Sequence, residues 1–386
     1  MSRFADALAQ PGLRAIAEVK RRSPSAGDLR PDADPARLAA QFAAAGAAAV
    51  SVLVDERFAG TVDDLRSARA ATDAPLLGKG FFSTDEQLSE LKEAGADAVL
   101  LILRDLDDAT CARLLAYAHD LGMDALVEAH DADELQRAMA LDAPVIGINA
   151  RNLETFEIDR RAQLELVARA PRDRIVIAES GVHTRAQGAA AELAGADAIL
   201  VGSSLMQAAD PPAKLRELLS RPLVKVCGLT RQEDVDAAVD AGADLLGFIH
   251  VEASPRRSDT VLDVPETQLA VSVFVEETRE TPADLIQFYP DRGTGVRGRE
   301  AMLLRDGVRV GTLLDQPWDE HDALHWSRAA AANGRIMLAG GLGPENVRAA
   351  IAAVRPWAVD ASSSLESEPG VKDHDRVRAY VEAARA

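Results

Sequence analysis

The chain has 386 residues, too many for one typical domain and suited to two barrels of roughly 200 residues each. Its 43 basic and 62 acidic residues give a net charge of −19, which disfavours nucleic acids and anionic membranes as partners. The N-terminal residues show no signal-peptide pattern, and no apolar run is long enough to span a bilayer, so we expect a cytoplasmic protein. The two cysteines, Cys111 and Cys227, lie far apart and predict neither a disulfide framework nor a metal site.

Short aliphatic segments alternate with Ala-rich, charged segments in the first half of the chain. This alternation is typical of parallel strands covered by helices. The phrase AGAD recurs at residues 94, 194 and 241, where a helix ends at a glycine and the next strand begins. Eight strands within about 200 residues predict an α/β fold with a closed (β/α)8-type barrel. The eight segments are 15–19, 49–54, 75–81, 98–103, 124–129, 145–149, 175–180 and 198–202.

The third AGAD lies beyond the eighth strand and indicates a second barrel in tandem. We expect domains at 1–219 and 222–386, because a proline follows the last helix of the first barrel and a new apolar strand starts at once. Only seven strands can be recognised in this half, and residues 274–295 contain no convincing helix. We therefore expect a barrel shortened by about one βα unit, with incomplete closure as one consequence. The seven segments are 224–230, 245–251, 269–275, 284–290, 308–314, 335–341 and 357–363.

Polar side chains at the ends of the predicted strands mark a candidate site in the first barrel. Barrels of this type place their active site at the carboxyl ends of the strands. Each residue alone could be a solvated surface charge, but their repetition at successive strand ends favours a site. A lysine among carboxylates suits acid-base chemistry, and Glu18 and Lys20 share a strand face where they can pair. These strand-end residues are Glu18, Lys20, Lys79, Glu128, Asn149, Glu179 and Ser180.

Small-residue turns follow the last two strands of each predicted barrel. The turns ESGVHT and VGSSLM, and later AGGLGPENV and VDASSSLE, expose backbone amides where such barrels bind phosphate. In the second half, Cys227 and Asp315 end two strands, and a thiolate with a carboxylic acid could perform an isomerisation. A buried core thiol is an equally good reading of Cys227. His119, His130 and His183 have no paired spacing, so a metal role is not predicted for them.

Four segments, IAEVKRRSPSAGDLR, LVEAHDADEL, GINARNLETFEID and ESGVHTRAQ, closely resemble indole-3-glycerol phosphate synthase. This resemblance can be followed from Leu13 to Pro211. The segments VKVCGLTRQED, GFIHVEASPRR, LAGGLGPENV and VDASSSLESEPGVKD resemble phosphoribosylanthranilate isomerase in the same order. Together the two halves resemble the bifunctional enzymes of tryptophan biosynthesis.

The resemblance implies an Amadori isomerisation in the second barrel, followed by decarboxylative ring closure in the first, on anionic sugar phosphates and without metal or cofactor. It implies Lys79 as general acid, Glu128 as base, and Lys20, paired with Glu18, as the group that holds the substrate carboxylate. Asn149, Glu179 and Ser180 would line the pocket. The resemblance leaves open a contact with other enzymes of the pathway.

The remaining implied roles concern phosphate and the second barrel. Cys227 would be the base and Asp315 the acid of the isomerase, and Arg256 would bind the anthranilate carboxylate. The implied phosphate-binding residues are Ser25, Gly181, Gly202 and Ser203 in the first barrel and Gly341, Ser362 and Ser363 in the second.

Several departures from the two families bear on function. The helical cap that usually precedes the first strand is mostly missing, and Gly80 stands beside Lys79 where the synthases have an aspartate, which frees the backbone. In the isomerase half, residues 287–290 only partly match the usual strand end, and QPWDEHDALHW replaces a phosphate loop after Asp315. Two alternatives therefore stay open: a synthase with a catalytically degenerate second barrel, and a binding protein with neither activity.

Overall fold

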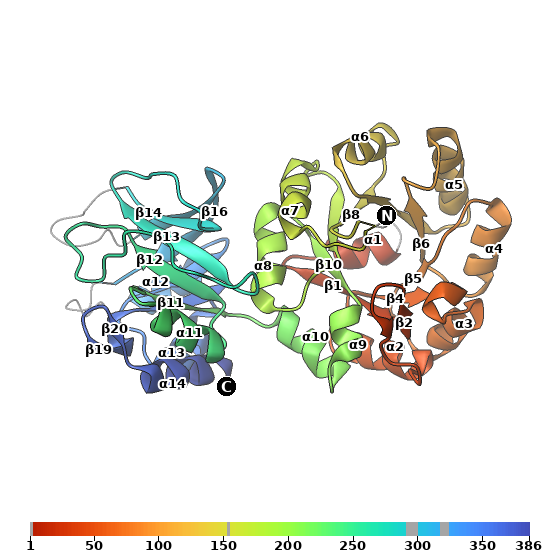
Figure 1. Cartoon of the computed structure of the whole chain (residues 1–386). Coiled ribbons are helices and arrows are strands. Elements are labelled where there is room, and N and C mark those ends of the chain that lie inside the picture. The colour runs from red at the N-terminus through yellow and green to blue at the C-terminus, as the bar shows by residue number, and fades with distance from the viewer. Residues whose placement is uncertain (1–2, 153–154, 291–299, 317–323) are drawn as a thin grey trace. The chain divides into compact units, whose positions relative to one another are not determined.

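The computed structural model describes residues 3–152, 155–290, 300–316 and 324–386. The chain divides into two compact units, each described by itself below (Figure 1). Unit 1 comprises Met1–His183 with Gly188–Leu219, and unit 2 comprises Thr184–Gln187 with Ser220–Ala386.

Eight parallel strands form a closed barrel in unit 1, in the order β1-β10-β9-β8-β7-β6-β5-β4. All eight strands predicted from the sequence are confirmed. A two-stranded hairpin, β2 (Arg22–Ser23) with β3 (Gly27–Asp28), follows the first strand. The barrel strands are β1 (Arg14–Val19), β4 (Ala49–Leu53), β5 (Leu76–Lys79), β6 (Ala98–Ile102), β7 (Asp124–Ala129), β8 (Val145–Asn149), β9 (Ile175–Glu179) and β10 (Ala198–Val201).

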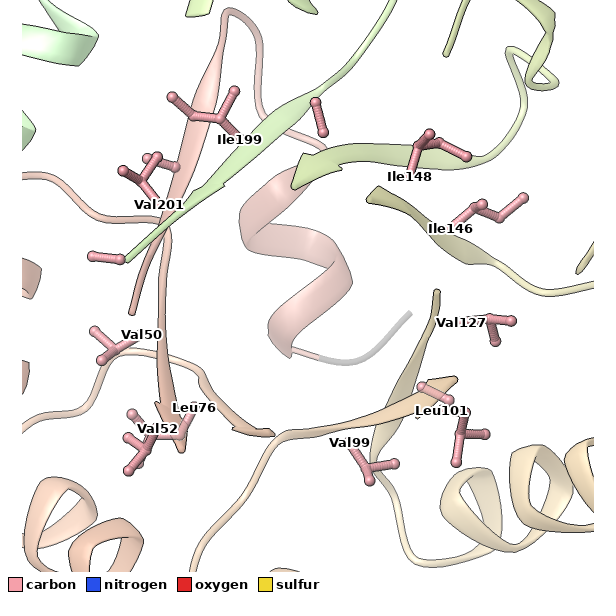
Figure 2. Packing of buried hydrophobic residues seen from close by; sticks show 14 of the residues in the cluster. Val50, Val52, Leu76, Val99, Leu101, Val127, Ile146, Ile148, Ile199 and Val201 are labelled. Atoms are coloured by element: carbon pink, nitrogen blue, oxygen red, sulfur yellow. The ribbon is translucent and has the colours of Figure 1, made fainter. Parts of the chain in front are cut away.

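Helices surround this barrel because alternate residues of each strand point outward. Figure 2 shows the outward set, which includes Val50, Val99 and Ile199, and these residues belong to one buried cluster with helix residues such as Phe42 and Leu114. The helices are α2 (Pro35–Ala44), α3 (Val62–Ala71), α4 (Asp85–Glu93), α5 (Asp108–Asp120), α6 (Ala132–Ala140), α7 (Arg160–Arg169), α8 (Arg185–Ala194), α9 (Ser203–Gln207) and α10 (Pro211–Leu219), with a short 3-10 turn, η1 (Glu56–Phe58).

A short N-terminal helix, α1 (Arg3–Leu8), packs onto the barrel interior at the end where the strands start. Its buried Phe4 and Leu8 cluster with inward residues such as Ile16 and Val145. Figure 2 shows this helix within the ring of strands. The helix therefore closes the end of the barrel opposite to the predicted active site, and is not a cover for the pocket.

The recurring AGAD phrase has a structural explanation in its aspartate. This residue lies just before a strand, and its carboxylate accepts a hydrogen bond from a backbone N–H near the start of the neighbouring strand. Without this carboxylate, the backbone N–H would have no hydrogen-bond acceptor inside the protein. The three bonds join Asp97 Oδ2 to Leu76 N at 2.9 Å, Asp197 Oδ2 to Val176 N at 2.8 Å, and Asp244 Oδ2 to Val224 N at 2.8 Å.

Unit 2 also contains a closed barrel of eight strands, in the order β11 to β18. The expectation that closure is incomplete is therefore wrong. Residues 250–268 and 276–284 between its strands contain no helix, as the sequence indicated for the second segment. The strands are β11 (Leu223–Cys227), β12 (Leu245–Ile249), β13 (Leu269–Val275), β14 (Leu285–Tyr289), β15 (Glu300–Arg305), β16 (Val308–Leu314), β17 (Ile336–Leu338) and β18 (Ala358–Ala361).

The strand that the sequence did not reveal is β15, which pairs antiparallel with both β14 and β16. Residues 306 and 307 form a two-residue turn in which Asp306 has φ 49° and Gly307 has φ 77°. An Asp-Gly pair with two positive φ angles is the usual turn of a tight β-hairpin. The barrel thus closes through a hairpin at a place where a βα unit would otherwise stand.

Helices cover the remainder of this barrel. Tyr380 of the last helix is fully buried and packs with Val226, Phe248 and Val377 in one apolar cluster. Its elements are α11 (Gln232–Asp240), α12 (His325–Ala331), α13 (Val347–Val354), η2 (Ser363–Leu365), the hairpin β19 (Glu366–Glu368) with β20 (Val371–Lys372), and α14 (His374–Arg385). Of the helices that the structure describes, none has the length and apolar character needed to cross a membrane.

The aspartate at a strand start should be tested by Asp197→Ala. The N–H of Val176 loses its partner, so we expect the free energy of unfolding to fall by about 1 to 3 kcal/mol, measured by urea denaturation. Amide hydrogen exchange at Val176 should become faster. Asp120→Ala at the exposed end of α5 is the control and should change stability by less than about 0.5 kcal/mol. Equal effects of both substitutions would contradict this role.

Candidate active sites at the strand ends

A cavity of about 280 Å³ opens at the carboxyl ends of the first barrel's strands. Ten of the eleven residues predicted for this site line the cavity, and Glu179 lies fully buried beside Lys79. The ten residues are Glu18, Lys20, Ser25, Lys79, Glu128, Asn149, Ser180, Gly181, Gly202 and Ser203.

Lys79 is the centre of a buried ion cluster. Its Nζ lies 2.7 Å from Glu179 Oε2, 3.5 Å from Glu18 Oε2 and 4.0 Å from Glu128 Oε2. The three carboxylates come from β9, β1 and β7, and the lysine comes from β5. Closure of the barrel therefore brings together four strand ends that are remote in the sequence.

Burial and charge act in opposite directions on these groups. Burial favours the neutral amine of Lys79, but the charges of Glu179, Glu18 and Glu128 outweigh it and raise the pKa of this lysine. Burial, together with the nearby Glu128 carboxylate, raises the pKa of Glu179. Burial also opposes ionisation of Glu128, yet the nearby imidazole of His130 and the charge of Lys79 lower its pKa. The pKa values of the two carboxyls are thus shifted in opposite directions, the usual arrangement of an acid-base pair.

The predicted ion pair between Glu18 and Lys20 is confirmed, with 2.9 Å between Lys20 Nζ and Glu18 Oε1. Glu18 is buried, and although burial opposes ionisation, the charges of Lys20 and Lys79 lower its pKa. A Cβ atom on Gly202 would lie 2.4 Å from Glu18 Oε1, so only glycine leaves room for this carboxylate. Gly202 thus has a packing role as well as its place in the cavity wall.

Gly80 does not leave open space beside Lys79. A Cβ atom at this position would lie 2.8 Å from the ring of Phe82 and 3.4 Å from Val54. The aromatic ring therefore occupies the place of a side chain at residue 80.

Arg151 and two aromatic rings are among the lining residues of this cavity that the sequence did not indicate. Arg151 lines it and donates hydrogen bonds to Ser25 Oγ at 3.2 Å and to the carbonyl oxygen of Phe156 at 3.1 Å. Phe58 and Phe81 also line the wall and stack with ring centroids 6.4 Å apart. Arg151 lies two residues after Asn149, but nothing in a single sequence distinguishes this arginine from other loop arginines.

His130 is the other group without a predicted role, and it contacts the proposed base. Its Nε2 lies 3.3 Å from Glu128 Oε1, and its Nδ1 lies 2.9 Å from Glu134 Oε2. Arg104 holds the second carboxylate from the far side, with 3.2 Å between Nε and Glu134 Oε1. Burial disfavours the imidazolium, but Glu128 and Glu134 outweigh it and raise the pKa of His130 to about 9.

A second cavity, of about 420 Å³, lies at the strand ends of unit 2. All six residues predicted for this site line it: Cys227, Arg256, Asp315, Gly341, Ser362 and Ser363. Residues 317–323 of the replaced phosphate loop lie outside the described part of the chain.

Cys227 stands next to a buried lysine. The Nζ of Lys225 lies 2.9 Å from Asp360 Oδ2, and the lysine side chain is fully buried. Burial raises the pKa of the Cys227 thiol, and the charge of Lys225 acts against this increase. The thiol is therefore mostly protonated when no substrate is bound.

Arg256, predicted to bind the anthranilate carboxylate, is paired with a carboxylate of the protein itself. Its Nε and Nη2 donate to Glu366 at 2.9 and 2.8 Å. Lys372 Nζ lies 2.9 Å from the same carboxylate. The Oγ of Ser362 is buried and has no hydrogen-bond partner among the described residues, which suits a binding group for an anion.

The described residues contain no group of three or more His, Cys, Asp and Glu side chains that could hold a metal ion.

Comparison with known proteins gives two matching family models. The model described as indole-3-glycerol phosphate synthase matches residues 1–218, and the model described as N-(5′-phosphoribosyl)anthranilate (PRA) isomerase matches residues 300–383.

Individual proteins are similar to one or both halves. The chain is 32% identical, over 99% of its length, to a multifunctional tryptophan biosynthesis protein of Schizosaccharomyces pombe, and it spans 61% of that protein. It is 48% identical to the indole-3-glycerol phosphate synthase of a Nocardioides species, with 54% of this chain and 80% of that one covered. A crystal structure of TrpF from Jonesia denitrificans is 29% identical, with a TM-score of 0.34, and covers 43% of this chain and 97% of that chain.

The charged state of His130 should make stability depend on pH. Its pKa is about 9 in the folded protein and about 6.5 when unfolded, so the stabilisation is complete below pH 6.5 and disappears as the pH rises through 9. We expect His130→Gln to destabilise the protein by about 1 to 3 kcal/mol at pH 6 and by much less at pH 10, measured by urea denaturation. His119→Gln, at an exposed position on α5, is the control. A stability difference for His130→Gln that stays constant between these pH values would contradict the assignment.

Proposed function

Because the chain belongs to the indole-3-glycerol phosphate synthase family, we propose that its first barrel, residues 1–219, forms indole-3-glycerol phosphate. The substrate is carboxyphenylamino-deoxyribulose phosphate, and the reaction is a decarboxylative ring closure. The observation that carries this proposal is the buried Lys79 ammonium, held by three carboxylates in the cavity at the strand ends.

Lys79 is the proposed proton donor. Attack of the aromatic ring carbon on the substrate carbonyl breaks the C=O π bond and places negative charge on its oxygen. The ammonium of Lys79 gives a proton to this oxygen as CO₂ leaves the ring. The raised pKa of Lys79 keeps the amine protonated before the reaction, and transfer remains favourable because an alkoxide is a stronger base than an amine.

Glu128 is the proposed base of the last step. The new hydroxyl leaves as water after it takes a second proton, and removal of a proton from the adjacent ring carbon completes the aromatic indole. A carboxylate with a lowered pKa is ionised at neutral pH and can accept that proton. Glu179 lies beside Lys79, and its raised pKa allows it to exchange a proton with Lys79 and Glu128.

The anionic ends of the substrate require local positive charge, since the whole chain carries −19. We assign the substrate carboxylate to Lys20, which lines the cavity while Glu18 holds it. Asn149 and Ser180 would line the pocket around the reacting atoms. The phosphate would be bound by Ser25, Gly181, Gly202 and Ser203, which line the same cavity.

We propose that the second barrel, residues 222–386, isomerises phosphoribosylanthranilate. Opening of the sugar ring needs a proton on the ring oxygen, and formation of the ketone needs loss of the proton on the second sugar carbon. Asp315 would give the first proton and Cys227 would take the second, and both line one cavity. Gly341, Ser362 and Ser363 would bind phosphate. The match of residues 300–383 to the isomerase model supports this assignment.

Two observations favour a synthase with a degenerate second barrel. The buried thiol of Cys227 has a raised pKa, and a neutral thiol is a poor base. Arg256 is engaged by Glu366, so it can meet the anthranilate carboxylate only as a group shared with that residue. The isomerase proposal therefore requires that substrate binding favours the thiolate. The isomerase proposal also implies a cytoplasmic location, where the Cys227 thiol stays reduced.

The synthase activity should depend on Lys79 and not on a lysine outside the cavity. We expect Lys79→Met to lower kcat at least 100-fold, because proton donation is lost, in an assay of indole-3-glycerol phosphate formation. Lys92→Met on the surface of α4 is the matched control and should retain wild-type turnover. Equal activity of the two variants would favour a binding protein without catalysis.

The isomerase activity should depend on one of the two cysteines. Cys227→Ala should abolish turnover of phosphoribosylanthranilate, because the proposed base is removed. Cys111→Ala, buried in α5 of the other barrel, removes a thiol of the same size and should leave isomerase turnover intact. If wild type shows no isomerase turnover while the synthase is active, the degenerate-barrel alternative is correct.

A further inference from the structure

A chain of buried hydrogen bonds runs through the wall of the second cavity and ends on Asp315. Lys225 Nζ donates to Gln287 Oε1 at 2.8 Å, Gln287 Nε2 donates to Tyr289 Oη at 2.9 Å, and Tyr289 Oη donates to Asp315 Oδ2 at 3.1 Å. Asp360 anchors the first member, 2.9 Å from Lys225 Nζ. All five side chains are less than 9% exposed, so the chain is shielded from water.

The direction of this chain is fixed by its first member. An ammonium can only donate, so the Gln287 oxygen must accept and its NH₂ group must donate onward. The Tyr289 oxygen accepts that bond, which leaves its own hydrogen for Asp315. Each bond polarises the next in the same sense, and the carboxyl is the terminal acceptor.

Strand geometry explains how two of these residues reach the cavity together. Gln287 and Tyr289 are two positions apart on β14, so both point to the barrel interior. Phe288 between them is partly exposed and points the other way. Because of this spacing, Gln287 and Tyr289 can carry the hydrogen-bond chain along one strand, from Lys225 to Asp315.

We propose that Tyr289 is a positioning residue for Asp315, the proposed acid of the isomerase. Its hydroxyl holds one carboxyl oxygen at the cavity wall and stabilises the carboxylate that forms during the reaction. In that step the bond between the first sugar carbon and the ring oxygen breaks, and its electron pair stays on the oxygen. This oxygen takes the proton of Asp315, while the nitrogen lone pair forms a C=N bond. The inference rests on the proposed isomerase function.

Other charged or titratable groups also affect the titration of this cavity. Among the described residues, Cys227, Asp360 and Arg256 line it. Lys225, paired with Asp360, and Glu366, paired with Arg256 and Lys372, lie behind them. Replacement of Tyr289 by Phe leaves all of these unchanged. A change in the pH profile of that variant therefore reports on the hydroxyl itself.

The test is Tyr289→Phe in the full chain, assayed with phosphoribosylanthranilate across pH. Without the hydroxyl the carboxylate product is less stable, so kcat should fall about tenfold or more. The limb of the kcat profile that reports on Asp315 should move to higher pH by about one unit, with KM changed less than about twofold. A lost packing contact alone would not displace that limb.

Tyr380→Phe is the matched control. Tyr380 is fully buried in α14 of the same barrel, and its hydroxyl has no hydrogen-bond partner among the residues that the structure describes. This variant should keep the wild-type kcat and pH profile. The proposal is overturned if Tyr289→Phe keeps them as well, or if both variants shift the profile alike.

A second variant covers the case in which Tyr289→Phe does not fold. A 3-fluorotyrosine placed only at position 289 keeps the hydroxyl and the ring shape but makes the phenol a stronger donor. The limb that reports on Asp315 should then move to lower pH, opposite to the phenylalanine variant, and an unchanged limb would also overturn the proposal. Absence of isomerase turnover in wild type is a different result, because it removes the proposed function itself.

Discussion

Burial of the Lys79 ammonium imposes the strictest constraint on the first barrel. A charge removed from water is expensive unless opposite charges replace the lost solvation, and breaking such a pair typically costs several kcal/mol. Here the compensating carboxylates come from β1, β7 and β9, so they meet the lysine only when the whole sheet is closed. The fold and the acid-base site are therefore one electrostatic arrangement. A shift of register in any of these strands would leave a charge buried without its partner.

The second barrel meets a similar constraint with different residues. Lys225 is also fully buried, in the middle of its strand, and Asp360 on the adjacent strand compensates it. The lysine of the first barrel reaches the cavity itself, whereas Lys225 lies behind Cys227 and Gln287 and acts on the cavity through them. Each barrel thus contains a buried lysine that is compensated by carboxylates. In the first barrel this lysine is the proposed proton donor, whereas in the second it lies beside the proposed catalytic residues.

Much of this architecture could be predicted from the sequence, because its causes are local. Apolar strand segments, helix-ending glycines and polar strand ends follow each other in a fixed order, and they located all eight strands of the first barrel and the Glu18–Lys20 pair. Partners remote in sequence were harder to find. Nothing near His130 indicates that it bridges Glu128 and Glu134, and Glu366 lies 110 residues from Arg256. β15 was missed because parallel strands were expected, although its Asp-Gly turn was visible in the sequence.

The hairpin of β15 and β16 has a consequence for how the second barrel folds. A parallel crossover joins its strands only after a helix has formed and packed, whereas a two-residue turn brings neighbouring strands together within microseconds. The hairpin therefore lowers the contact order of this half and can form before the ends of the sheet meet. Because β15 runs opposite to the other seven strands, its carboxyl end faces away from the cavity, and none of its residues lines that space. This strand contributes to assembly of the barrel, and the residues that touch substrate must come from its neighbours.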